Sequence, residues 1–163
     1  MKKLCKLLLL AAVLLALGLL PFRASDVAEL IPVRTVVITR AGDAYQVDVG
    51  QGLKALGKTL AEALDRLRRE APGEIFFRTA EQVVVTRDAA DVVTQAVQCP
   101  DLRPAAGLYL TPDAAPDAEA IAAFLSAHPA DTTLARVRGE LLSGRTPRIP
   151  TLRRTEGGYL VTQ

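Results

Sequence analysis

The sequence predicts an α+β fold of α/β-like character, in which a mixed β-sheet with an opening hairpin carries about four helices, after an N-terminal hydrophobic helix. Two observations predict this class. Runs of β-branched residues alternate with segments whose apolar residues recur at helical spacing, in the order β-α-β-α-β-α. In addition, residues 83–85 are three consecutive valines, and a run that is apolar on both faces is typical of an interior strand.

The N-terminal segment is basic over residues 1–6 and then apolar over residues 7–22, without one charged side chain. This pattern is typical of an export signal, and the leading lysines predict that the chain beyond it lies outside the cytoplasm. Cleavage requires small residues at positions −3 and −1 of the cut, but Phe22 and Arg23 occupy position −3 of the available cuts. Residues 1–25 are therefore either a cleaved signal sequence, which would leave a secreted protein, or a retained membrane anchor.

The chain beyond this segment is close to neutral. Four of the 20 basic residues precede Ala24, so 16 basic residues face 18 acidic ones in the remainder. The arginines are scattered among carboxylates, which argues against nucleic acid as a partner. Cys99 is the one cysteine of the exported part, so no intrachain disulfide is expected. We expect one α/β domain over residues 26–143, followed by an extended linker and a β-hairpin over residues 144–163.

The opening hairpin is predicted by two short segments. Residues 33–39 are rich in β-branched side chains, and residues 45–49 alternate apolar and polar side chains after a glycine-containing turn. We expect Tyr45 to be half-buried with its hydroxyl at the surface. Three glycines then punctuate a segment that we interpret as a loop: Gly50, Gly52 and Gly57.

The first helix is predicted to begin at Thr59, because Thr59 and Glu62 fit a capping box. Pro72 and Gly73 end this helix. Its apolar face consists of Leu60, Ala63, Leu64 and Leu67.

A broken strand and a second helix follow. Residues 75–77 and 82–86 are strand-like, with an interruption over residues 78–81. Asp88 is expected to cap the second helix, which Pro100 stops.

The last third of the chain contains one further strand, two helices and a hairpin. Residues 105–110 form the strand, and Asp117 caps a third helix that ends before Pro129. A fourth helix begins at Thr132 or Thr133. Residues 145–150 form the linker, and residues 151–163 form a hairpin that turns at residues 156–158.

Five strings in this chain resemble those of a known family and occur in the same order: residues 26–30, 35–49, 57–63, 75–90 and 101–103. The most specific is residues 75–90, IFFRTAEQVVVTRDAA. It is similar to a pattern that begins with a Leu or Ile, two phenylalanines and a frequent histidine, for which this chain has Thr79. Together the strings resemble the N-terminal domain of the Ger(x)C spore-germination proteins, the membrane-attached C subunits of nutrient germinant receptors.

The resemblance implies a short or truncated form of such a protein, without the family's later domains. It also implies a non-enzymatic extracytoplasmic protein that acts in spore germination through contact with membrane subunits of a germinant receptor. Relatives are tethered by a lipidated cysteine, and no cysteine lies just after the apolar run here, so the resemblance favours residues 1–25 as the tether. The candidate interaction residues are Asp26, Glu29, Asp101 and Arg103. The alternative is an exported domain that binds a small ligand or the cell envelope and has no part in germination.

No catalytic, cofactor-binding or metal-binding residues are predicted. Cys99 and His128 have no second group at a spacing suited to a metal or to a nucleophile–base pair, so a secreted hydrolase is the least favoured class. Lys58 and Thr59 after Gly57 are only a fragment of a phosphate-binding loop. We expect His128 to interact with the last carbonyls of its own helix.

Overall fold

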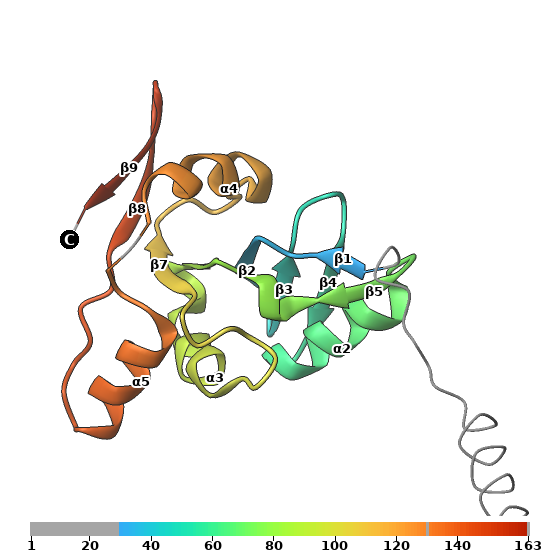
Figure 1. Ribbon diagram of the computed structural model, residues 1–163, viewed down its shortest axis with the longest axis horizontal. Coiled ribbons are helices and arrows are strands. Elements are labelled where there is room, and N and C mark those ends of the chain that lie inside the picture. The colour runs from blue at the N-terminus through green and yellow to red at the C-terminus, as the bar shows by residue number, and fades with distance from the viewer. Residues whose placement is uncertain (1–29, 130, 163) are drawn as a thin grey trace, which may run out of the picture.

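A seven-stranded mixed sheet with helices on both faces forms the centre of the computed structural model, which describes residues 30–129 and 131–162 (Figure 1). The predicted class, a mixed sheet with an opening hairpin and helices packed on it, is confirmed. The hydrophobic helix expected within residues 1–25 lies outside the described residues.

The large sheet has the strand order β4-β3-β2-β6-β7-β8-β9. Its strands are β2 (Thr35–Ala41), β3 (Ala44–Asp48), β4 (Lys54–Gly57), β6 (Gln82–Thr86), β7 (Gly107–Thr111), β8 (Thr151–Thr155) and β9 (Gly158–Thr162). The four strands β2, β6, β7 and β8 run parallel, and antiparallel strands flank them at both edges. Two further strands, β1 (Leu30–Pro32) and β5 (Glu74–Phe76), pair in parallel as a separate ribbon.

The first face of the sheet is covered along most of its width. It carries α2 (Leu60–Glu70), the 3₁₀ helix η3 (Arg87–Val92), α3 (Val93–Gln98) and α5 (Leu134–Leu142). Apolar side chains from every one of these helices join the same core, to which β2, β3, β4, β6 and β7 contribute their inward-facing residues. As predicted, Thr59 caps α2, and its side-chain oxygen accepts a hydrogen bond from the Glu62 amide at 3.2 Å.

The second face carries one helix, α4 (Ala118–Ala127), which begins after the predicted cap Asp117. Ile121 and Leu125 of α4 pack on Val84 and Tyr109 in a smaller core. Figure 1 shows α4 on the opposite side of the sheet from α2, α3 and α5. Because α4 lies over the middle and the β9 side of the sheet, it leaves β3 and β4 uncovered on this face.

The structure corrects two details of the sequence-based prediction. Residues 54–57, expected within a loop, form β4 and pair with β3. Their alanine and glycine have little intrinsic strand preference, so pairing and the close packing of Gly57 against α2 specify the strand. Asp88 does not cap a helix, because the chain first makes η3, which begins at Arg87 without a side-chain cap.

The interruption expected between residues 75–77 and 82–86 is confirmed. The 3₁₀ helix η2 (Phe77–Thr79) separates β5 from β6, so β5 joins β1 while β6 joins the large sheet. The predicted C-terminal hairpin is also confirmed, and it extends the same large sheet, since Thr151 of β8 pairs with Leu110 of β7.

Candidate functional site

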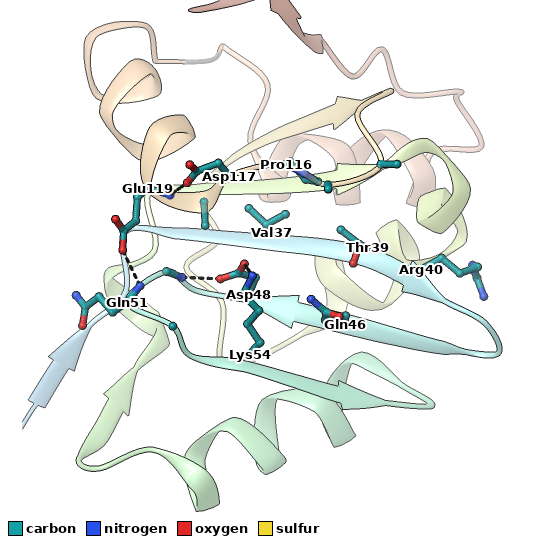
Figure 2. Close-up of a pocket in the computed structure, with 15 residues that line it drawn as sticks. Val37, Thr39, Arg40, Gln46, Asp48, Gln51, Lys54, Pro116, Asp117 and Glu119 are labelled. Atoms are coloured by element: carbon teal, nitrogen blue, oxygen red, sulfur yellow. Dashed lines mark hydrogen bonds and ion pairs between the residues drawn. The ribbon is translucent and has the colours of Figure 1, made fainter.

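An open groove lies on the second face of the sheet, beside α4. Side chains alternate along β2, β3 and β4, so the side chains that do not enter the large core point to the second face. Thr39, Gln46, Asp48 and Lys54 therefore form a polar floor where α4 does not cover the strands. Figure 2 shows these side chains on neighbouring strands beneath the segment that leads into α4.

The groove encloses about 620 Å³. One wall is the segment between β7 and α4 with the first turn of α4, and one end is the turn between β3 and β4. It is lined by Val37, Thr39, Arg40, Gln46, Asp48, Gly50, Gln51, Gly52, Lys54, Ala114, Ala115, Pro116, Asp117, Ala118 and Glu119.

Asp48 and Lys54 form an ion pair on the groove floor. Asp48 Oδ2 lies 2.9 Å from Lys54 Nζ, and Asp48 Oδ1 accepts a hydrogen bond from the Gly50 amide at 2.9 Å. The hydrogen bond to Asp48 raises the pKa of Lys54, and the charge of Asp117 adds to that effect. The Asp48 side chain is only 11% exposed whereas that of Lys54 is 54% exposed, so the ammonium is the accessible partner.

The wall of the groove is fixed to the β3–β4 turn by a carboxylate. Glu119 Oε1 accepts a hydrogen bond from the Gln51 amide at 2.9 Å. Gln51 has a φ of 55°, which is uncommon for a residue with a side chain, and it stands between two glycines of positive φ. This hydrogen bond therefore joins the β3–β4 turn, with its positive φ angles, to the first turn of α4.

The start of α4 is itself held by Asp117. Its Oδ1 accepts hydrogen bonds from the Glu119 amide at 3.0 Å and the Ala120 amide at 3.2 Å. Asp48, Asp117 and Glu119 therefore all have intramolecular partners that shape the groove. The groove presents to a ligand an ammonium, an amide, a hydroxyl and a wall of small apolar residues, together with the Arg40 guanidinium and the exposed carboxylates of Asp117 and Glu119. This set is suited to hydrogen bonding and close contact.

The interaction residues predicted from the sequence lie elsewhere. Asp26 and Glu29 fall outside the described residues. Asp101 pairs with Arg68 of α2 at 2.8 Å, on the helix-covered face, and Arg103 has no ion pair within the part of the chain that the structure describes. Neither residue lines the groove.

The groove residues were missed because the sequence does not reveal where α4 packs. The alternation over residues 45–49 does place Gln46 and Asp48 opposite the core side chains Tyr45 and Val47. That alternation was a usable signal of a face exposed to solvent. The groove wall, by contrast, depends on the path of the chain between β7 and α4.

A second polar cluster joins the β2–β3 hairpin to η3. Tyr45, expected to be half-buried, is only 5% exposed, and its hydroxyl donates a 2.5 Å hydrogen bond to Asp91. Arg40 pairs with the same carboxylate and donates through Nε to the Asp88 carbonyl at 2.9 Å. The hydrogen bond from Arg40 and then that from Tyr45 lower the pKa of Asp91. This cluster fastens the hairpin to the helical layer.

Histidine and cysteine, the residue types most often used in catalysis, make packing and hydrogen-bond contacts within the described residues rather than forming a reactive pair. His128 lies at the end of α4, where its Nδ1 is 3.0 Å from the Phe124 carbonyl, as expected, and its ring stacks on that of Phe124. Cys99 is half-buried as a free thiol, and burial raises its pKa. Among residues 30–129 and 131–162, no group of three His, Cys, Asp or Glu side chains could hold a metal ion.

Comparisons with protein-family models, curated proteins and solved structures find no match to this chain. Within the described residues, no helix is long and apolar enough to cross a membrane.

Proposed function

We propose that this protein is a non-enzymatic, extracytoplasmic interaction domain that residues 1–25 hold at the membrane. It is related to the C subunits of germinant receptors and acts in spore germination by contacting a membrane subunit of such a receptor. The resemblance strings that fall within the described residues support the proposal. Residues 35–49 form the β2–β3 hairpin and residues 57–63 form the junction of β4 with α2.

The observation that carries the proposal is the uncovered half of the second face. β3 and β4 have a well-packed core on one side and a polar floor on the other. The one carboxylate of these two strands, Asp48, has intramolecular partners, and the accessible groups on the floor are those of Thr39, Gln46 and Lys54. Side chains that donate and accept hydrogen bonds across a fixed sheet surface suit recognition of a partner.

A second candidate function is an exported domain that binds a small ligand or the cell envelope and has no role in germination. The size of the groove favours this candidate, because about 620 Å³ falls within the range of small-molecule sites. The neighbouring genes distinguish the two: genes for a transporter-like membrane subunit and a receptor A-type subunit favour the germination role.

The experiment that tests the proposal is deletion of the gene in the organism that carries it, followed by a nutrient-germination assay on purified spores. We expect slower germination in nutrients and normal germination with a trigger that bypasses the receptors. The full chain, returned to the deletion strain, restores the rate. Spores that form and germinate normally without the gene contradict the proposal.

A further inference from the structure

The outer face of the β1–β5 ribbon is exposed and carries Pro32 and Phe76, with the carboxylate Glu74 on the same side. Pro32 is paired with Phe76 in the parallel register, so both side chains point to the same side. Ile31 and Ile75 point the other way and pack against the large core. Phe76 is 40% exposed although Ile31 and Ile75 hold the ribbon against the core. The fold therefore keeps an aromatic ring at the surface.

Two arginines flank this face. Arg34 and Arg78 each follow a ribbon strand by two residues, and both are exposed. Thr79 holds the two segments side by side, because its hydroxyl donates to the Val33 carbonyl and accepts from the Val33 amide, both at 3.0 Å. Within the described residues, neither arginine forms an ion pair with a carboxylate.

Within the described residues, the exposed carboxylates in the segments next to the ribbon strands include Glu70, Glu74 and Glu81. An exposed phenylalanine with arginines nearby in the sequence is a combination typical of protein surfaces that lie at the membrane–water interface. The aromatic ring enters the boundary of the acyl chains, while the guanidinium groups stay at the level of the phosphates.

The covalent connection places this face close to the tether. Residues 23–29 separate the apolar run from Leu30, the first residue of β1. Seven residues span at most about 25 Å when fully extended. A short link of this kind gives the ribbon a high effective concentration at the surface in which the tether is embedded, so even a weak contact is populated.

We propose that the outer face of the β1–β5 ribbon, centred on Phe76, lies on the lipid surface, with Arg34 and Arg78 facing anionic headgroups. This inference rests on the proposed membrane anchoring by residues 1–25. It gives the domain an orientation, because Figure 1 shows α5 and the β8–β9 hairpin at the end of the molecule away from β1 and β5. That end then faces away from the membrane.

The test uses the absence of tryptophan from the chain, which makes each introduced tryptophan a single reporter. The reporters are Phe76→Trp and, on the partner strand, Pro32→Trp. The matched control is Leu160→Trp on β9, whose side chain is 52% exposed at the far edge of the sheet. The full chain is reconstituted in phosphatidylcholine vesicles containing phosphatidylglycerol, with and without brominated acyl chains, and flotation measures the bound fraction.

We expect brominated lipid to quench the Phe76→Trp and Pro32→Trp reporters and to leave the Leu160→Trp reporter bright, with a blue-shifted emission for the first two. If the chain floats but the ribbon reporters are quenched no more than the control, the inference is overturned and the anchoring stands. If the ribbon reporters are protected from iodide but not quenched by brominated lipid, protein covers the face, and the inference is again overturned. A chain that does not float overturns both the anchoring and the inference.

Discussion

Strands β3 and β6 belong to the same sheet but differ on its second face. All five residues of β6 are buried, because α4 covers Val84 on one side and the helices of the first face cover its neighbours on the other. In β3, Tyr45 and Val47 are buried whereas Gln46 is partly exposed in the groove. The difference shows that one half of the sheet is closed on both faces, while the other half is closed on one face and open for contact on the second.

The largest expected effect compares leucines on the two sides of β4. Leu64 of α2 is fully buried beneath the strand, and Leu56 is 42% exposed on its open side. Leu64→Ala should lower the free energy of unfolding by about 3 kcal/mol, because it removes buried apolar volume and leaves a cavity. Leu56→Ala should change it by less than about 0.5 kcal/mol. Urea unfolding measures both values. Equal losses would contradict the conclusion that β4 is buried on one face and open on the other.

The next effect concerns Gly57, where β4 approaches α2. A Cβ atom at Gly57 would lie 2.4 Å from the Ala63 amide nitrogen, a backbone atom that cannot move away freely. Gly57→Ala should therefore cost about 2 kcal/mol in the same unfolding experiment. The matched control is Gly139→Ala in α5, where a Cβ would meet nothing within 4 Å. That variant should raise the free energy of unfolding by up to about 1 kcal/mol, because alanine has a higher helix propensity than glycine.

A smaller effect is expected at the groove wall. Asp117→Ala removes the cap of α4 and should cost about 1 kcal/mol. Asp117→Asn keeps a side-chain oxygen for the Glu119 and Ala120 amides and should recover most of that loss. Thermal unfolding followed by circular dichroism gives the ranking, and an Asn variant as unstable as the Ala variant would show that the cap is not what Asp117 supplies.

The smallest effect is a pH dependence from Asp91, beside Arg40 and Tyr45. Because the folded state lowers the pKa of Asp91 below its ordinary value of 3.8, its ion pair stabilises the protein above that pH and is lost as the pH falls below it. The Asp91 side chain is 59% exposed, so the contribution is less than about 1 kcal/mol. Unfolding of wild type and Asp91→Asn at pH 7 and pH 3 measures it. The difference between the two proteins should shrink at pH 3, and a constant difference would contradict the assignment.

The sequence predicted the elements whose signals are local. The capping residues Thr59 and Asp117 and the opening hairpin are confirmed because each depends on neighbours within a few residues. The strand β4 was missed because pairing with β3 and contact with α2, rather than its own composition, make it a strand.

The candidate site could be predicted only in part. Alternation placed Gln46 and Asp48 on the face opposite the core, but the groove also needs the wall at Pro116 and the bond from Gln51 to Glu119. Gln51 and Glu119 are 68 residues apart in the chain, and no local pattern specifies that contact. The ion pair of Asp101 with Arg68 was likewise hidden, since the nearest basic residue in the sequence is Arg103.

The most direct test of the account places one substitution on each side of the sheet. Gln46→Arg puts a long cation into the groove, and Gln98→Arg makes the same change at the exposed end of α3. Both variants should unfold at nearly the wild-type urea concentration. Each is returned as the full chain to the deletion strain, and the rate of nutrient germination is measured. We expect Gln98→Arg to restore the rate and Gln46→Arg not to, whereas equal restoration by both variants, at equal protein levels, would show that the groove is not the contact surface.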